Sequence, residues 1–355
     1  MNDNISTRQI CFILIAYNAA TKLLLYPSAA ANTVGNALVF SALFNLILQS
    51  VIIWSVAYLC SRTDDTFFGL LTNTFGKVGA RVIYGLFALY FLLSAIIPMN
   101  EQQLLVHDSF YDTMPSLLVF LPFFIFSVYA GVKSFSNVGR CADICLPVFA
   151  VTIIAFLVMS VGEADFTNLL PVLKQPFSTV AEFSLSSIFR FSESAFLIMF
   201  MGNFKYRKGD AAKLTLSYVL GGLLVIALMA AFYSLYGPLA ATRSFAISNV
   251  SAFFPVISFT GRIDLFVVYA FDFVALFAIV LNVQMCVHCL CHAFNNNAKV
   301  IYSLFVNLAL IVITFLANNN YSILQEAAGK WFWIPAVIFA YVVPVLCWAL
   351  RRKPR

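Results

Sequence analysis

Two groups of polar residues interrupt long apolar stretches of the sequence, and their side chains could bind a small polar molecule. The first group is the segment Asn18, Ala19, Ala20, Thr21 and Lys22, in which two alanines separate the polar residues. The second group is rich in serine and contains Arg190, Ser192, Glu193 and Ser194. Amide, hydroxyl, amine and carboxylate groups inside an apolar stretch cost free energy, so such residues usually mark a ligand pathway or pair with one another.

Lys22 is the most unusual residue of the first group. It lies about 12 residues, or roughly 18 Å, from the start of an apolar run that begins at Ile10. That depth is near the middle of a bilayer, where a charge costs roughly 2.5–3.5 kcal/mol. The lysine could snorkel, could form a structural ion pair, or could belong to a binding site.

Glu193 lies at a similar depth in the run Phe183–Gly202. Arg190 is three residues earlier and could share a helix face with it, so a local structural pair is one interpretation. The other interpretation is a binding site in a locally unwound helix, because serine hydroxyls can satisfy the freed backbone groups. Five serines are available: Ser184, Ser186, Ser187, Ser192 and Ser194.

Further polar positions occur in other apolar runs. Tyr90 and Ser94 could face the same site, although tyrosine is also common in helix packing. Asp272 lies one or two turns inside a later run and could contact the ligand or simply form interhelical hydrogen bonds. The run Asn100–Gln103 is predicted to mark the outer interface of the membrane.

A cysteine- and histidine-rich segment, Cys286–His292, contains good ligands for soft metals. On a helix, however, Cys286, Cys289 and His292 drift around the axis, and no partner cluster exists elsewhere in the sequence. We therefore predict neither a metal site nor a cofactor.

The composition indicates an integral membrane protein. Apolar residues make up 62% of the 355 residues and charged residues 10%, against about 45–50% and about 25% in soluble proteins. The net charge of +6 comes from short basic clusters between apolar runs, so it does not indicate nucleic-acid binding. We expect the protein to be surrounded by membrane lipid.

The elements that must position these residues are membrane helices, which need about 20 apolar residues each. The runs are continuous rather than alternating, which argues against a β-barrel. We expect an all-α polytopic protein with one transmembrane domain over residues 1–355, divided into five-helix repeats at 1–161 and 183–350. The ten predicted spans are Ile10–Ala31, Ala37–Leu59, Val78–Met99, Ser116–Ala130, Ile144–Val161, Phe183–Gly202, Leu214–Tyr236, Leu265–His288, Ile301–Ala317 and Phe332–Leu350.

The distribution of lysine and arginine predicts the orientation. With the N-terminus in the cytoplasm, the cytoplasmic segments hold 15 basic residues and the outer loops hold four. This bias predicts that both termini are cytoplasmic, including the basic segment Arg351–Arg355. The apolar outer stretch Phe245–Phe259, which contains Pro255, is predicted to form a short helix on the outer face.

The first and sixth spans are equivalent members of the two five-helix halves, and both are polar in the middle. Interrupted helices at matched positions mark transporter binding sites, because their open backbone offers N–H groups to a carboxylate and C=O groups to an amine. There is no GxxxxGK[ST] motif and no room for a nucleotide-binding domain. Titratable groups are too scattered for a nucleophile–base arrangement, so we do not predict an enzyme.

Several segments resemble the GerAB-type spore germination permeases. They are Ile5–Gln9, Leu23–Ser28, Asn168–Leu173, Glu193 and the basic loop Lys205–Lys208, in that order. The resemblance implies the amino acid–polyamine–organocation superfamily with a LeuT-like five-plus-five inverted repeat. It also implies the B subunit of a nutrient germinant receptor in the inner membrane of a spore. Such a subunit binds a small nutrient, typically an amino acid, and works with A and C subunits.

Two positions depart from that family's pattern. Ala20 stands where members usually have a glycine, and it is followed by Lys22 where most have a small residue. A proline usual late in the sixth span is absent from Met199–Gly202. The alternative function is a secondary amino-acid transporter coupled to an ion or proton gradient, since the same fold serves both.

Overall fold

The computed structural model describes residues 5–62, 65–110, 114–171, 174–252, 264–318 and 321–350, and these residues form helices with no strand. The first half contains α1 (Thr7–Lys22), α2 (Tyr26–Val34), η1 (Gly35–Ala37), α3 (Leu38–Cys60), α4 (Phe67–Phe110), α5 (Ser116–Gly131), α6 (Phe135–Ser160) and η2 (Phe166–Leu169). The second half contains α7 (Phe177–Ser186), η3 (Ile188–Arg190), α8 (Ser194–Met199), α9 (Asp210–Tyr236), η4 (Gly237–Thr242), α10 (Ala246–Ala252), α12 (Asp264–Phe294), α13 (Lys299–Asn318), α14 (Tyr321–Ala327), η5 (Ala328–Phe332), α15 (Trp333–Ala336), η6 (Val337–Val342) and α16 (Val343–Leu350).

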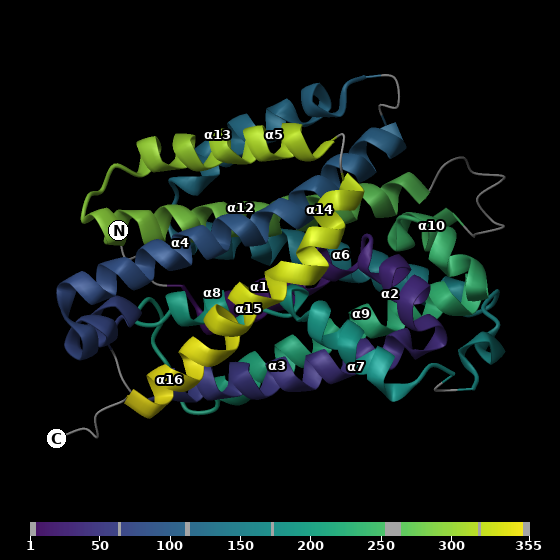
Figure 1. Cartoon of the computed structure of the whole chain (residues 1–355), viewed down its shortest axis with the longest axis horizontal. Helices are drawn as coiled ribbons and strands as arrows, with labels where there is room; N and C mark the ends of the chain where they lie inside the picture. Colours follow the sequence, from purple (N-terminus) through teal and green to yellow (C-terminus); the bar gives the residue numbers. More distant parts are fainter. Residues whose placement is uncertain are drawn as a thin grey trace.

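The helices pack as one elongated bundle (Figure 1). Seven helical stretches among the described residues are long and apolar enough to cross a membrane. The remaining three of the ten predicted spans are α5, which has 16 residues, and the first and sixth spans, each of which is broken into shorter helices. The all-α polytopic architecture is therefore confirmed, and the two broken spans are the ones that the polar residues indicated.

Several helices are longer than their apolar cores predicted. The third span forms α4 with 44 residues and passes through Asn100–Gln103 without stopping. These four side chains are buried in the bundle, and that they mark the outer interface of the membrane stays a prediction. A hydropathy pattern predicts the end of a span where polar residues begin. The helix itself continues past them when their side chains are buried against other parts of the protein.

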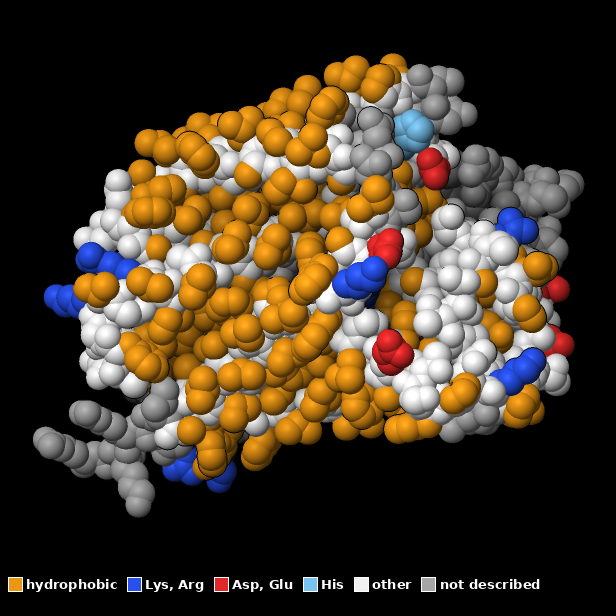
Figure 2. All heavy atoms as spheres, in the orientation of Figure 1, with side chains coloured by type: hydrophobic (Ala, Val, Ile, Leu, Met, Phe, Trp, Pro, Cys, Tyr) orange, Lys and Arg blue, Asp and Glu red, His pale blue; other side chains and the backbone are white. Residues whose placement is uncertain are grey.

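Large apolar side chains cover much of the molecular surface (Figure 2). Examples that are more than half exposed are Phe44, Val51, Ile144, Val151 and Phe305. An apolar surface of this extent faces lipid in a multi-pass membrane protein. The N-terminus and the end of α16 lie at the same end of the bundle, as an even number of spans requires (Figure 1). That this end is cytoplasmic stays a prediction, and Arg351–Arg355 lie outside the described residues.

The break in the first span has local causes. The span begins with a capping box in which Ser6 and Gln9 exchange side-chain and backbone hydrogen bonds. Helix α1 ends at Lys22, where a cation is favourable because of the helix dipole. After Leu23–Leu25 the chain restarts as α2, with Pro27 in its first turn, where the missing N–H of proline costs nothing.

Helix α9 holds α1 in place by close packing. A side chain at Gly221 would meet the Cα atom of Ile15 at 3.0 Å, and one at Gly222 would overlap Leu46 on α3. Small residues allow helices in membranes to approach closely. The two glycines therefore fix α1 and α3 on α9 beside the broken part of the first span.

The predicted outer helix Phe245–Phe259 is described in part. Its beginning forms α10, over Ala246–Ala252, next to α9 and α12. Pro255 and the rest of the segment lie outside the described residues.

Candidate binding site

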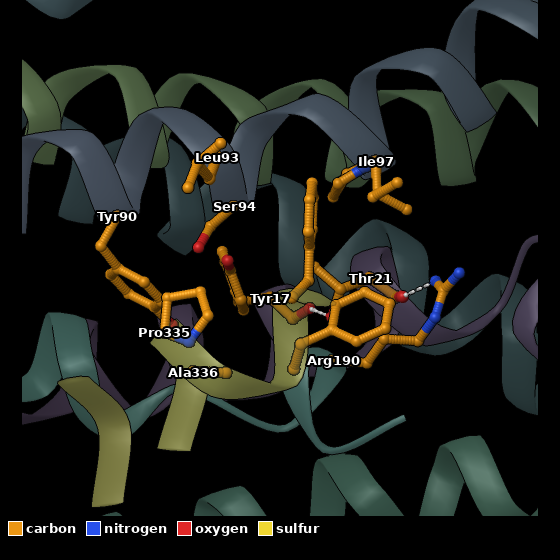
Figure 3. A pocket seen from close by; sticks show the side chains of 12 residues that line it. Tyr17, Thr21, Tyr90, Leu93, Ser94, Ile97, Arg190, Pro335 and Ala336 are labelled. Atoms are coloured by element: carbon orange, nitrogen blue, oxygen red, sulfur yellow. Dashed lines mark hydrogen bonds between the residues drawn. The ribbon is translucent and has the colours of Figure 1, made fainter. Parts of the chain in front are cut away.

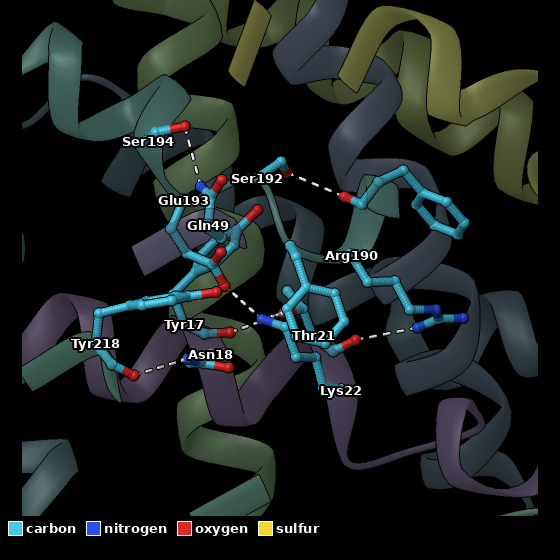
Figure 4. A network of polar contacts seen from close by, with 12 residues as sticks. Tyr17, Asn18, Thr21, Lys22, Gln49, Arg190, Ser192, Glu193, Ser194 and Tyr218 are labelled. Atoms are coloured by element: carbon cyan, nitrogen blue, oxygen red, sulfur yellow. Dashed lines mark hydrogen bonds and ion pairs between the residues drawn. The ribbon is translucent and has the colours of Figure 1, made fainter. Parts of the chain in front are cut away.

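A buried ion pair joins the two broken spans. The amine of Lys22, at the end of α1, donates a hydrogen bond to the carboxylate of Glu193, which is the residue before α8. Both side chains are completely buried, and the amine lies 4.6 Å from the centre of the Phe191 ring (Figure 4). Lys22 therefore does not snorkel, and the sequence prediction that Lys22 and Glu193 lie at a similar depth agrees with this geometry.

A second buried ion pair lies close by. The guanidinium of Arg190 donates to Glu101 on α4 at 2.5 Å and to the backbone carbonyl of Thr21 at 3.0 Å. Arg190 ends η3 and Glu193 precedes α8, with non-helical backbone between them. The interpretation that these two residues share one helix face is therefore wrong, because the helix is broken between them.

Side chains of α3 and η6 satisfy the open backbone of the sixth span. Asn45 donates to the carbonyl of Ser184 at 2.9 Å, and Tyr341 donates to the carbonyl of Phe191 at 2.6 Å. The amide orientation of Gln49 that satisfies both of its polar atoms lets its oxygen accept from the N–H groups of Glu193 and Ser194 at 3.0 and 2.8 Å. Buried backbone N–H and C=O groups need hydrogen-bond partners. These side chains supply the partners where the helix of the sixth span is broken, and so they stabilise the break.

The polar residues of α3 were not predicted from the sequence as part of the site. Ser41, Asn45 and Gln49 are spaced by four, which places them on one helix face. All three are completely buried. A polar stripe of this kind inside an otherwise apolar span was the signal that could have identified them.

A central cavity lies between the first broken span, η3, α4 and α15 (Figure 3). Its volume is about 30 Å³, which is room for about one water molecule, so a bound amino acid requires its walls to move apart. Its walls are mainly apolar and aromatic. They also include four residues with a hydroxyl group, of which Thr21 is one, and one residue with a guanidinium group. The lining residues are Tyr17, Thr21, Tyr90, Leu93, Ser94, Ile97, Pro98, Phe189, Arg190, Phe332, Pro335 and Ala336.

The predicted site residues divide into two sets. Thr21, Tyr90 and Ser94 line the central cavity. The others are buried behind it or elsewhere: Asn18, Ala19, Ala20, Lys22, Ser192, Glu193, Ser194 and Asp272. The structure thus places the first set where a ligand could touch it, while the role of every predicted residue in binding stays a prediction.

The second set makes contacts within the protein. Asn18 donates to the carbonyl of Tyr218 at 3.2 Å, and Ser192 donates to the carbonyl of Phe189 at 3.0 Å. Ser194 donates to the carbonyl of Ala340. Asp272, on α12, accepts a hydrogen bond from Gln102 on α4, which fits the interhelical alternative.

A larger vestibule adjoins the central cavity and has a volume of about 580 Å³. It lies between α2, α7, η3 and α14, and it shares Ile97, Phe189 and Arg190 with the central cavity. Glu326 and Lys330, which are exposed and form an ion pair, line its rim. A small group of acidic and basic side chains also interrupts the hydrophobic surface in Figure 2.

The segment Cys286–His292 packs into the protein interior on α12. His288 and His292 have ring centres 4.7 Å apart, and His288 also packs on Phe135. The thiol of Cys286 donates to the carbonyl of Ala88 at 3.2 Å. Within the described ranges, no group of three or more His, Cys, Asp or Glu side chains is placed to hold a metal ion.

The fold and the two broken spans define the class. The structure is similar to that of MhsT in complex with L-phenylalanine, with a TM-score of 0.62 and 13% sequence identity over 96% of this chain and 87% of that one. This similarity shows a LeuT-like fold. The chain belongs to the spore germination protein family of permeases, whose sequence pattern matches residues 4–322. No curated protein matches the sequence.

Proposed function

We propose that this protein is the B subunit of a nutrient germinant receptor and that it binds a small amino acid in the central cavity to trigger germination. The observation that carries the proposal is the position of this cavity beside the ends of the two broken spans. Family membership supports a nutrient permease or receptor. The similar structure of MhsT was solved in complex with L-phenylalanine, which supports an amino acid as the class of ligand.

The chemistry of the cavity fits such a ligand. Leu93, Ile97 and Pro335 offer an apolar surface for a side chain, and Tyr90 and Ser94 offer hydroxyl groups. Ligand pockets commonly combine apolar walls with a few placed polar groups that orient the ligand. The proposal includes A and C subunits as partners, and it assigns no catalytic step to the protein.

A binding experiment with two matched variants tests the site. The purified protein is titrated with L-alanine, L-leucine and L-phenylalanine, with a sugar and a nucleoside for comparison. Ser94→Phe fills the cavity from α4 and should abolish the thermal stabilisation by the amino acid. Leu89→Phe enlarges an exposed position of the same helix and should leave it unchanged. Equal stabilisation of both variants would move the site elsewhere.

The second candidate function is a secondary amino-acid transporter coupled to an ion or proton gradient. The observation that favours it is the vestibule beside the central cavity, because the two share Ile97, Phe189 and Arg190 in their walls. Uptake of the radiolabelled amino acid into proteoliposomes, with and without a sodium or proton gradient, separates the two. Binding without uptake supports the receptor, and gradient-driven uptake supports the transporter.

A further inference from the structure

A separate cavity lies at the end of the bundle where the chain begins (Figure 1). Its volume is about 180 Å³, against about 30 Å³ for the central cavity, and none of its described lining residues also lines the central cavity. The turn between α5 and α6, the last part of α12 and the start of α13 form most of its walls. Asn203 also lines it, and the backbone carbonyl of Asn203 accepts a hydrogen bond from the N–H of Ile5 at 3.0 Å.

The charged groups on the lining of this cavity are basic. Lys133 and Lys299 contribute amines, and His288 and His292 contribute imidazoles. The amine of Lys299 is close enough to both imidazoles to interact with them electrostatically. The part of the lining that the structure describes contains no aspartate or glutamate. We call this space the basic cavity after these four residues.

Neither lysine is neutralised by a carboxylate within the described part of the chain. The amine of Lys133 lies 4.0 Å from the centre of the Tyr129 ring, which attracts the cation but carries no net charge. Lys299 is exposed and is absent from the ion pairs that the described carboxylates form. Two such cations at one cavity attract an anion.

Helix α6 adds N–H groups to the same wall. It begins at Phe135, and the preceding residue, Ser134, does not cap it with a side-chain hydrogen bond. Both residues line the basic cavity. The first N–H groups of a helix have no partners inside the helix and carry partial positive charge. This arrangement favours a phosphate or another anion at the start of α6.

A buried acceptor sets a second requirement for the ligand. Gln284 lines the basic cavity, and only 2% of the residue is exposed. Its amide nitrogen donates to the carbonyl of Lys133 at 2.5 Å, but its amide oxygen has no hydrogen-bond partner among the described residues. A buried acceptor without a partner costs free energy, so a ligand that fits this cavity also carries a hydroxyl or another donor.

We propose that the basic cavity binds a phosphate ester that carries a free hydroxyl group. The phosphate oxygens accept hydrogen bonds from Lys133, Lys299 and the first N–H groups of α6, and the hydroxyl donates to Gln284. Glycerol 3-phosphate as a free solute and the headgroup of phosphatidylglycerol in the lipid share this chemistry. The site is apart from the central cavity, so this inference goes beyond the proposed function and does not rest on it.

Thermal unfolding of the delipidated protein in neutral detergent tests the free solute, because a ligand that binds only the folded state raises the unfolding temperature. Glycerol 3-phosphate is compared at matched ionic strength with glycerol, which lacks the phosphate, and with ethyl phosphate, which lacks the hydroxyl on carbon. We expect the largest stabilisation from glycerol 3-phosphate, a smaller one from ethyl phosphate and none from glycerol. Equal effects of glycerol and glycerol 3-phosphate would overturn the proposal, and equal effects of the two phosphates would overturn the role of Gln284.

Nanodiscs of phosphatidylcholine, with and without phosphatidylglycerol, test the lipid source. Stabilisation by phosphatidylglycerol alone identifies the lipid headgroup as the ligand, whereas stabilisation by glycerol 3-phosphate in detergent identifies the free ester. If neither compound stabilises the protein, the proposal is overturned, and the amino-acid titrations of the central cavity are unaffected.

Lys133→Gln and Lys299→Gln test the site itself. Lys133 is half-buried and Lys299 is exposed, so neither substitution leaves a buried charge. Each removes a charge-assisted hydrogen bond and should weaken the binding of glycerol 3-phosphate, or of phosphatidylglycerol, about tenfold. The matched control is Lys77→Gln, because Lys77 is exposed on α4 and lies outside the lining. Wild-type binding in both cavity variants, or an equal loss in all three, would overturn the proposal.

Discussion

The two buried ion pairs near the broken spans use similar side chains in different surroundings. Lys22 and Glu193 connect the two broken spans and are completely enclosed. Arg190 and Glu101 connect η3 to α4, and Arg190 faces both cavities. An enclosed pair can only hold the fold together, because no ligand reaches it without a rearrangement. A pair at a cavity wall can also meet a ligand.

The different surroundings of the two ion pairs indicate different roles, one structural and one in ligand recognition, for residues that look alike in the sequence. Both Lys22 and Arg190 are basic residues deep in an apolar span, and each would be a candidate for the same function. Only the contacts of each cation show which one faces open space. The predictions below test whether stability and ligand recognition divide between the two pairs in this way.

Lys22→Met should have the largest effect on stability. It leaves the carboxylate of Glu193 buried without its cation, and breaking a buried pair in this way costs about 3–5 kcal/mol. Thermal unfolding of the purified protein in detergent measures the loss. The double variant Lys22→Met/Glu193→Gln should be less impaired than the sum of the single variants by about 0.5–3 kcal/mol. Strict additivity would show that the two residues are not coupled.

Glu101→Gln should cost less, roughly 2–3 kcal/mol. The glutamine oxygen can still accept from Arg190, and Arg190 keeps its hydrogen bond to the carbonyl of Thr21. The same unfolding assay applies, together with titration of the amino acids. A loss larger than that of Lys22→Met would reverse the proposed order of the two pairs.

Gln49→Leu should destabilise the N-terminus of α8 by roughly 1–3 kcal/mol. The substitution removes the oxygen that accepts from the N–H groups of Glu193 and Ser194, so the ion pair with Lys22 also loses its fixed position. Ser55→Ala, elsewhere on α3, removes only a hydrogen bond to the carbonyl of Val51 and serves as the control. Equal stabilities of the two variants would mean that Gln49 does not hold the break.

Asp272→Asn should have the smallest effect, below about 1 kcal/mol, which is typical of one interhelical hydrogen bond in a membrane. The asparagine oxygen can still accept from Gln102. Because Asp272 is absent from the lining of the central cavity, titration should give an unchanged affinity for the amino acid. A clear loss of affinity with normal stability would restore Asp272 as a ligand-binding residue.

The sequence predicted which two spans are broken, because polar residues interrupt both apolar runs. In the first span, however, Asn18–Lys22 are the last residues of α1, and the break follows them at Leu23–Leu25. The sequence also predicted that Lys22 and Glu193 lie at one depth, since depth follows from the rise per residue. These predictions depend only on the local sequence and on the thickness of a bilayer.

The sequence could not identify the partners of the charged residues. Arg190 was matched with Glu193 because three residues separate them, but that rule holds only on an unbroken helix. Its partner in the structure, Glu101, is 89 residues away. Such a contact depends on how α4 packs against η3, which no local pattern contains. Gln49 differs, because its spacing from Ser41 and Asn45 is a local pattern that could have identified it.

The last span contains two π-helical segments, η5 and η6, on either side of α15. A π turn accommodates one residue more than an α turn does. Removal of one residue from η6 would therefore restore an α turn and rotate the residues beyond it by about 100°. Ala340 and Tyr341, which contact the broken sixth span, could not then both keep their positions. The number of residues in this segment is thus as much a part of the site as the identity of its side chains.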